Sequence, residues 1–92
     1  MLEVVLSNRF KRDLKRAVRR GCQVELLEEV VNTLAKRQPL PESNHDHILT
    51  GNWSGYRECH IQSDWLLIYK ANEDALVLLL MRTGTHADLF NC

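Results

Sequence analysis

The sequence predicts an α+β domain in which a helical pair packs on one face of an antiparallel sheet, in the order β-α-α-β-β-β. Three observations predict this fold class. The chain has 92 residues, which suits one small domain over residues 1–92. Two consecutive segments between residues 8 and 37 carry apolar residues at helical spacing. Three runs with strand composition follow, separated by short polar turns, at about residues 56–62, 64–71 and 75–83.

The first strand and the first helix meet at Ser7. Residues 2–6, LEVVL, have the β-branched composition of a short strand. Ser7 then lies at the N-cap, where its hydroxyl can accept a hydrogen bond from a free amide of the helix. The apolar stripe of this helix is Phe10, Leu14, Ala17 and Val18. Gly21 favours a helix end, because glycine readily adopts the left-handed conformation found just after helices.

The second helix is expected over about residues 23–37. Its apolar stripe is Val24, Leu27, Val31 and Leu34, widened by Leu26 and Val30. Glutamates lie early in this helix and Lys36 and Arg37 lie late, as the helix dipole favours. Pro39 and Pro41 then end it. Because only a short turn separates the two helices, we expect them to form an antiparallel pair.

The remaining strands are expected to form a meander. Residues 42–55 are rich in turn residues, with a brief strand at about 47–49. The segments QSD and ANED act as turns between three antiparallel strands, and the final GTHADLFNC has room for one turn of helix. Side chains alternate along a strand, so Glu58 and His60 share one face and Cys59 lies on the other. Since the helices cover the Cys59 face, we expect Glu58 and His60 on the open face of a four-stranded sheet.

Composition narrows the class of protein. The chain is 45% apolar and 26% charged, as in an average soluble globular protein, and no apolar run is long enough to span a membrane. The N-terminus places its charges after a short apolar run, which is the reverse of a signal peptide. The cysteines, Cys22, Cys59 and Cys92, are odd in number and lack CxxC spacing, which argues against disulfides and zinc knuckles. We therefore expect a cytoplasmic protein.

The zero net charge conceals an uneven distribution of charge. Residues 1–37 carry nine Lys/Arg and five Asp/Glu, a net of +4, whereas residues 38–92 carry three and seven, a net of −4. Seven of the basic residues lie within 9–20: Arg9, Lys11, Arg12, Lys15, Arg16, Arg19 and Arg20. Such a cluster indicates either a polyanionic or acidic partner, or simply a solvated helix face.

Three histidines are candidates for chemistry: His47, His60 and His86. His60 lies on the face expected to be open, His47 precedes it in the loop or edge strand, and antiparallel pairing can bring His86 near the middle of the sheet. Glu58 shares a face with His60, and Asp64 opens the next strand. Imidazoles beside carboxylates are the groups that general acid–base catalysis needs. We therefore expect these side chains to gather at one site.

Each candidate also has a structural interpretation. Glu58 and His60 can form a polar pair on a solvated face, and Asp64 can cap the QSD turn. Phe90 can hold the C-terminal segment against the core. The HDH segment can instead contribute to a metal site, although no spacing in the chain completes a familiar set of ligands. The residue types alone leave these alternatives open.

Longer motifs point to a known family. The segments HILTGNWSGYRECHIQSDWLLIYK and RTGTHADLF resemble the YafQ branch of the RelE/ParE superfamily of bacterial toxins. The resemblance covers about residues 45–90, and the predicted order of elements fits the RelE-like microbial RNase fold. It implies the toxin of a type II toxin–antitoxin system, a ribosome-dependent endoribonuclease that cleaves mRNA in the A site.

The resemblance also implies roles for individual residues. The positions that match the family's catalytic residues, with the aromatic that supports them, are His47, His60, Asp64, His86 and Phe90. Arg82 matches the basic residue that precedes TGTH, and Arg57 is a second cation in the motif. Glu58 stands where the best-known member of the family has aspartate.

The implied chemistry needs no cofactor or metal, because RNA supplies its own nucleophile, the 2′-OH. A base removes the 2′-OH proton, the oxygen attacks the adjacent phosphorus in line, and an acid protonates the departing 5′-oxygen. We expect His86 as the acid and His60 or His47, oriented by Asp64, as the base. Arg82 or Arg57 would then neutralise charge on the phosphorane.

The implied partners are the ribosome with its mRNA and a small DinJ-like antitoxin encoded alongside, with operator DNA bound only through the antitoxin complex. The basic residues of 9–20 then gain ribosomal RNA phosphates as a partner, and an acidic antitoxin competes for the same surface. The family is usually more basic than this chain. The alternative function is therefore a RelE-fold binding module that occupies the ribosome or another partner without cutting RNA.

Overall fold

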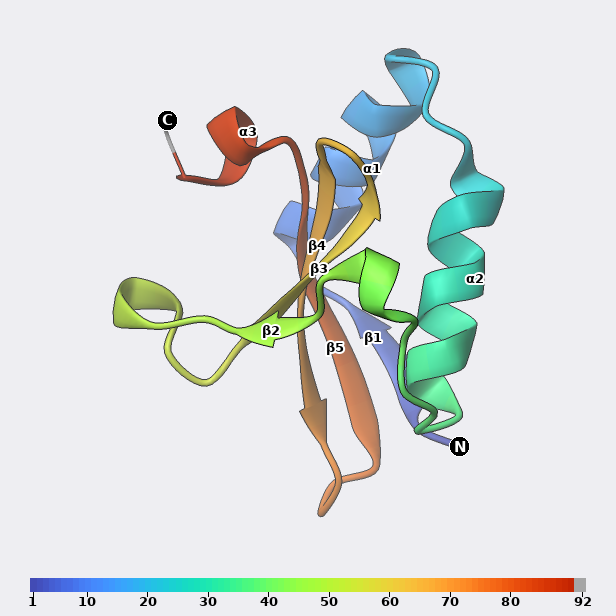
Figure 1. The fold of residues 1–92 in the computed structure, drawn as a ribbon, viewed down its shortest axis with the longest axis vertical. Helices are drawn as coiled ribbons and strands as arrows, with labels where there is room; N and C mark the ends of the chain where they lie inside the picture. The colour runs from blue at the N-terminus through green and yellow to red at the C-terminus, as the bar shows by residue number, and fades with distance from the viewer. Residues whose placement is uncertain (91–92) are drawn as a thin grey trace.

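A mixed β-sheet forms the centre of the fold, which the computed structural model describes for residues 1–90 (Figure 1). Its strands lie side by side in the order β1-β5-β4-β3-β2. They are β1 (Glu3–Leu6), β2 (His47–Ile48), β3 (Arg57–Gln62), β4 (Trp65–Asn72) and β5 (Val77–Gly84). The helices are α1 (Asn8–Arg19), α2 (Val24–Ala35) and α3 (His86–Phe90), with single 3₁₀ turns η1 (Glu42–Asn44) and η2 (Gly51–Trp53).

The predicted α+β class and order of elements are confirmed, with one difference in strand direction. The β2–β3, β3–β4 and β4–β5 pairs are antiparallel, as expected for a meander. Strand β1 instead runs parallel to β5, with Glu3 opposite Val77, and β2 extends the sheet to five strands among the described residues. A parallel pair requires a long connection, which the helices and the meander provide between β1 and β5.

The helices begin and end for the expected local reasons. Ser7 Oγ accepts a hydrogen bond from the Phe10 amide at 2.9 Å and donates one to the Met81 carbonyl of β5 at 2.6 Å. Gly21 follows α1 with a φ of +86°. Helix α2 ends two residues before the predicted position, since Arg37 adopts a left-handed φ of 60°.

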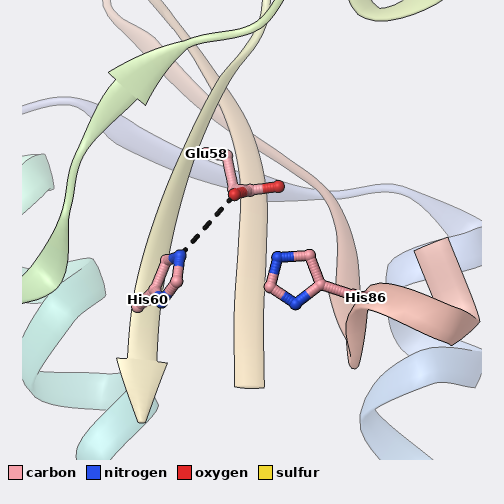
Figure 2. Close-up of side chains that lie close together, drawn as sticks. All are labelled: Glu58, His60 and His86. Atoms are coloured by element: carbon pink, nitrogen blue, oxygen red, sulfur yellow. Dashed lines mark ion pairs between the residues drawn. The ribbon is translucent and has the colours of Figure 1, made fainter. Parts of the chain in front are cut away.

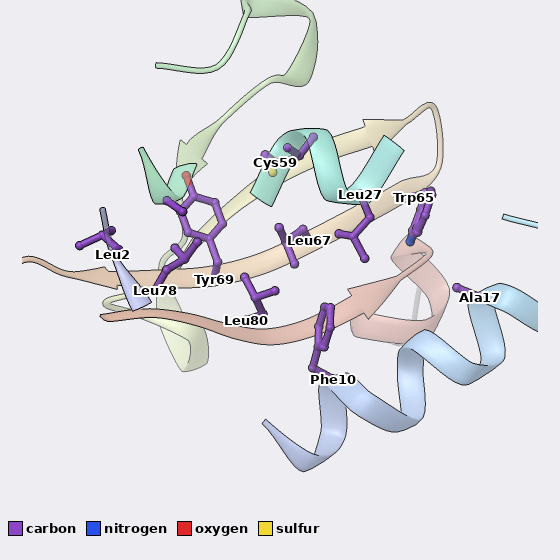
Figure 3. Packing of buried hydrophobic residues seen from close by; sticks show 12 residues of the cluster. Leu2, Phe10, Ala17, Leu27, Cys59, Trp65, Leu67, Tyr69, Leu78 and Leu80 are labelled. Carbon is purple, nitrogen blue, oxygen red and sulfur yellow. The ribbon is translucent and has the colours of Figure 1, made fainter. Parts of the chain in front are cut away.

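The main core lies between the sheet and α1 and α2 (Figure 3). Cys59, Leu67 and Tyr69 point from the sheet into this layer, where they pack with Phe10 of α1 and Leu27 of α2. On α1 the buried residues are Phe10, Asp13 and Ala17, whereas Val18 is 52% exposed. The predicted stripe therefore holds at Phe10, Leu14 and Ala17 but is wrong at Val18.

A second, smaller apolar cluster covers part of the opposite face, which the sequence predicts to be open. Leu66 and Ile68 of β4 pack there with Leu89 of α3. Partly buried side chains surround them: Leu49, Trp53, Tyr56, Met81 and Phe90. As a result Glu58 is only 4% exposed, so it does not line a free surface as expected.

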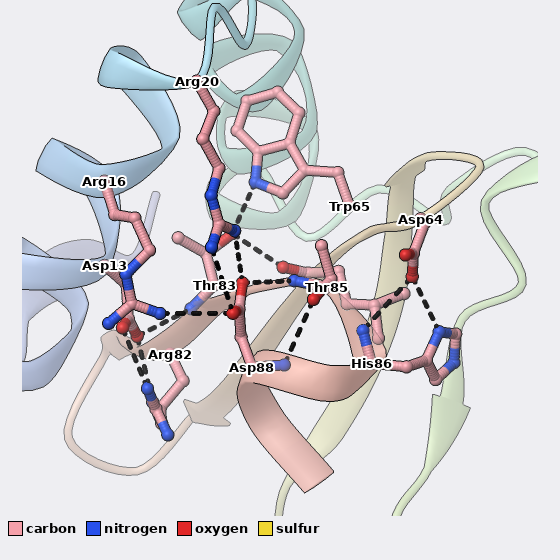
Figure 4. A network of polar contacts seen from close by, with 11 residues as sticks. Asp13, Arg16, Arg20, Asp64, Trp65, Arg82, Thr83, Thr85, His86 and Asp88 are labelled. Carbon is pink, nitrogen blue, oxygen red and sulfur yellow. Dashed lines mark hydrogen bonds and ion pairs between the residues drawn. The ribbon is translucent and has the colours of Figure 1, made fainter. Parts of the chain in front are cut away.

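Asp13 joins α1 to the end of β5 (Figure 4). Its carboxylate is 3% exposed and accepts hydrogen bonds from Arg82 Nε at 3.0 Å, Arg82 Nη2 at 2.9 Å and the Thr83 amide at 3.2 Å. The hydrogen bonds to Asp13 raise the pKa of Arg82. Thr83 Oγ1 also donates to the Leu66 carbonyl and accepts from Trp65 Nε1. This buried network sets the position at which the chain leaves the sheet.

Asp88 attaches α3 to α1 (Figure 4). Its amide donates to Thr85 Oγ1 and its carboxylate accepts from the Thr85 amide, which is a reciprocal capping arrangement. The carboxylate also pairs with Arg20 at 2.6 Å and with Arg16 at 3.3 Å. The hydrogen bond from Arg20 is the largest cause that holds the pKa of Asp88 well below its usual range. A Cβ at Gly84 would lie 2.9 Å from the Asp88 side chain, so this turn requires glycine.

The described residues also bear on two sequence predictions, the absence of a membrane span and of disulfides. No helix within residues 1–90 is both long and apolar enough to cross a membrane. Cys22 and Cys59 are free thiols, and burial raises the pKa of Cys59 to about 12. Cys92 lies outside the described residues.

We predict that Asp13→Ala lowers the free energy of unfolding by about 3 kcal/mol, because it leaves the Arg82 charge buried without its partner. Urea denaturation followed by circular dichroism measures the change. Asp74→Ala, in the exposed turn after β4, is the control and should stay within about 0.5 kcal/mol of the wild type. A loss below about 1 kcal/mol for Asp13→Ala would show that the pair does not hold the two elements together.

Asp88→Asn should reduce stability at neutral pH, and the difference from wild type should shrink in acid. The pKa of Asp88 is lowered in the fold, so its contribution is complete above the unfolded value of about 3.9 and is lost as the pH falls below it. Thermal unfolding of both proteins between pH 7 and pH 2 measures this. A difference that stays constant with pH would mean that the ion pairs contribute nothing.

Candidate active site

Glu58, His60 and His86 point toward one another from β3 and the start of α3 (Figure 2). One ligand-type atom from each lies within 4.8 Å of the others, and the His60 and His86 rings are 5.8 Å apart. The sheet register explains the meeting, because His60 pairs with Leu66, and Leu66 pairs with Gly84 at the end of β5. Three neighbouring strands thus bring residues distant in sequence to one row.

Glu58 lies between two imidazoles. Its Oε1 is 3.5 Å from His47 Nε2 and 3.8 Å from His60 Nε2. His47 reaches this position because it pairs directly with Glu58 across β2 and β3. The other nitrogen of His47, Nδ1, is 2.7 Å from the His45 carbonyl. A carbonyl only accepts hydrogen bonds, so Nδ1 carries a proton and Nε2 is the atom that faces Glu58.

Asp64 orients His86, in contrast to the expectation that it orients His60 or His47. Its Oδ1 lies 3.0 Å from His86 Nδ1 and accepts the His86 amide at 3.2 Å. The hydrogen bond from His86 is the main cause that lowers the pKa of Asp64. The carboxylate therefore stays ionised and holds a proton on Nδ1, which leaves Nε2 of His86 free to exchange one. The difference arises because the turn after β3 lies beside the start of α3.

Phe90 borders the same cluster. Its ring is 6.3 Å from the His86 ring, at 42°, and it packs against the smaller apolar cluster. Both interpretations of Phe90 from the sequence, a core residue and a site residue, are therefore compatible with its position.

The two arginines expected to support the site are each paired with an aspartate. Arg57 points to the other face of β3, where its Nε donates to Asp46 at 3.3 Å beside the Tyr69 hydroxyl. Arg82 lies in the same row of the sheet as Glu58, since both pair with Ile68, and its guanidinium is held by Asp13. A role for either guanidinium at the phosphate stays a prediction.

His45, in the turn-rich segment of residues 42–55, also lies in this region. Its ring lies 5.2 Å from the His60 ring in an edge-to-face arrangement. It adopts a left-handed conformation, with φ 48° and ψ 44°, just after η1. No sequence signal indicates this contact, because it depends on how η1 folds back on β3.

Most of the basic residues of 9–20 are free to meet a partner. Arg9, Lys11, Arg12, Lys15 and Arg19 are exposed along α1. Arg16 and Arg20 are the exceptions, since both pair with Asp88. Asp88 belongs to the same helix as His86, so the part of α1 that carries Arg16 and Arg20 lies beside α3.

Comparison with known proteins places this site in a family. The family described as "Bacterial toxin of type II toxin-antitoxin system, YafQ" matches residues 2–91. The mRNA interferase toxin YafQ of Escherichia coli strain K12 is 38% identical over 89 residues, which are 96% of this chain and 95% of that protein.

Two solved structures of similar fold are also toxins. A metal-bound toxin from Helicobacter pylori has a TM-score of 0.92 and 41% identity, over 98% of this chain and 100% of that chain. YafQ in the E. coli DinJ–YafQ complex has a TM-score of 0.88 and 37% identity, over 98% and 99% of the two chains. On these matches, which span nearly its whole length, the chain belongs to the YafQ family of bacterial toxins of type II toxin–antitoxin systems.

Proposed function

We propose that this chain is the toxin of a type II toxin–antitoxin system and cleaves mRNA as an endoribonuclease on the ribosome. The observation that carries the proposal is the meeting of His60, His86 and Glu58, with His47 on the other side of the same carboxylate. The name of the E. coli relative, mRNA interferase toxin YafQ, supports the same activity.

The geometry suits transfer of two protons at one phosphodiester. His60 or His47, both beside Glu58, takes the proton of the 2′-OH as the O2′–P bond forms. His86 gives its Nε2 proton to the 5′-oxygen as the P–O5′ bond breaks, while Asp64 holds its other nitrogen. The products are a 2′,3′-cyclic phosphate and a 5′-hydroxyl. Each positioned acid or base contributes about 10²–10⁴-fold to the rate.

We propose that the ribosome helps to hold the RNA, because the candidate site offers little positive charge for the RNA backbone. Among the described residues near Glu58, Arg57 and Arg82 are each paired with an aspartate, which limits the positive charge that this site offers to the RNA backbone. The exposed cations of α1 can instead bind ribosomal RNA phosphates, and this attraction weakens steeply with salt. We therefore place the activity in the cytoplasm, on the ribosome, with α1 as the contact surface.

An antitoxin is the second proposed partner. The E. coli relative is crystallised in complex with DinJ, so we propose that a DinJ-like antitoxin inhibits this chain and contacts operator DNA for the pair. An acidic antitoxin would bind the same basic face of α1 that the ribosome uses, which makes the two partners compete.

A binding module that occupies the ribosome without cutting RNA is the alternative function. The zero net charge of the chain favours neither strong RNA binding nor an independent nuclease. Primer extension on ribosome-bound message separates the two, because only cleavage leaves discrete 5′ ends within codons.

His86→Ala and, separately, His60→Ala should each reduce cleavage of ribosome-bound mRNA by at least about 100-fold, because each removes one proton-transfer group. Primer extension on translating ribosomes measures the loss, and circular dichroism checks that both variants fold. Glu73→Ala, in the turn after β4, is the control and should cleave like the wild type. Full cleavage by both histidine variants would refute the catalytic proposal.

A transition-metal ion is a second ligand that the same cluster favours. Two imidazoles and a carboxylate are donors that Zn²⁺ and Cu²⁺ accept, and the H. pylori relative is described as a metal-bound toxin. Ligand atoms around tetrahedral zinc lie about 3.4 Å apart, so the half-exposed His86 would have to move inward. We propose that such an ion competes with RNA and inhibits the toxin.

Cleavage should be insensitive to EDTA, and micromolar Zn²⁺ or Cu²⁺ should inhibit it reversibly. Isothermal titration of the ribosome-free protein measures binding, and Glu58→Gln should weaken binding at least about tenfold by removing the anionic ligand. Glu73→Gln, the same substitution in the exposed turn after β4, is the matched control. Loss of cleavage in EDTA would instead make the toxin metal-dependent, and equal binding by Glu58→Gln would place the ion elsewhere.

A further inference from the structure

A cleft of about 480 Å³ adjoins the cluster of proton-transfer groups at His60. It is lined by residues of η1 and just after it, of the end of β3 and of the β3–β4 turn: Ser43, Asn44, His45, His60, Ile61, Gln62 and Ser63. Its lining includes neither Glu58 nor His86. The His60 ring contacts His45 at 5.2 Å and His86 at 5.8 Å, so His60 is shared by the cleft and the site of cleavage.

The lining has the chemistry of a nucleobase site. Asn44 and Gln62 carry side-chain amides, Ser43 and Ser63 carry hydroxyls, and His45 offers an aromatic ring. Unpaired RNA bases are bound by stacking on aromatic side chains, histidine included, and by hydrogen bonds to their polar edges. None of the described residues that line the cleft is a lysine or an arginine, so the lining does not suit a phosphate group.

The walls of the cleft are held in place before any ligand binds. The Asn44 amide nitrogen donates to the His60 carbonyl at 2.7 Å, which fastens η1 to β3. The left-handed backbone at His45 is fixed from both sides, since its amide donates to the Glu42 carbonyl and its own carbonyl accepts from His47. The left-handed backbone is unfavourable for a histidine, and residues in such strained conformations are concentrated at functional sites.

We propose that this cleft receives the nucleobase next to the scissile phosphodiester, with His45 as its stacking platform and Gln62 and Asn44 as the groups that read its edge. The proposal rests on the proposed endoribonuclease function, because it places the base one residue, His60, away from the reacting phosphate. The cleft is then a determinant of which codons are cut, distinct from the groups that move protons.

The test measures binding without cleavage. Dinucleoside monophosphates with a 2′-O-methyl group at the scissile ribose lack the nucleophile, so they can be titrated into the ¹⁵N-labelled protein. We expect shifts at the backbone amides of Asn44, Gln62 and Ser63, and about tenfold weaker binding by His45→Gly, which removes the ring but tolerates the left-handed backbone. His45→Tyr restores a stacking surface and should bind within about threefold of wild type. Glu73→Ala, in the distant β4–β5 turn, is the control.

Cleavage provides the second readout. Gln62→Ala should change which codons are cut on translating ribosomes, because Gln62 reads a base but moves no proton. The subsite is overturned if wild type cleaves mRNA but His45→Gly binds the dinucleotides equally well, or if the shifts map away from the cleft. If the dinucleotides bind in the cleft but wild type cuts no mRNA, the base site stands and the endoribonuclease proposal fails.

Discussion

The buried carboxylate of Asp13 is the interaction on which the position of the site depends. Removing a carboxylate from water is unfavourable unless several donors replace the lost hydration, and here Arg82 and the Thr83 amide supply three hydrogen bonds. These bonds tie the end of β5 to α1. The chain then turns at Gly84 and enters α3, so His86 stands where it does because β5 ends against Asp13.

Charges in this fold are divided between two kinds of pair. The arginines that approach the sheet are each bound to an aspartate: Arg57 to Asp46, Arg82 to Asp13, and Arg16 and Arg20 to Asp88. The carboxylates of Glu58 and Asp64 meet imidazoles instead. The permanent positive charges of these arginines therefore hold elements together, and the candidate site consists of carboxylates beside imidazoles. The exposed positive charges of the chain's first helix lie on another surface, along α1.

Local rules in the sequence account for much of the fold and part of the site. Ser7 and Gly21 bound α1 because capping depends only on neighbouring residues, and alternation along β3 correctly separates Glu58 and His60 from Cys59. The parallel pairing of β1, the burial of Asp13 and the contact of His45 depend on partners far away in the chain. The spacing of polar residues on a helix does not show which of them will meet an arginine, so neither the burial of Asp13 on α1 nor the placement of Arg82 could be predicted from it.

The same limit explains why the sequence left the base open between His60 and His47. Both rings face one oxygen of Glu58, at 3.8 Å and 3.5 Å, and neither distance is that of a well-formed hydrogen bond. The proposed proton acceptor is therefore one of two imidazoles beside a single buried carboxylate, and the side chain of Glu58 lies within 4 Å of both. The position of Glu58 beside both imidazoles depends on how β2 pairs with β3, and the residue type at 58 alone does not reveal it.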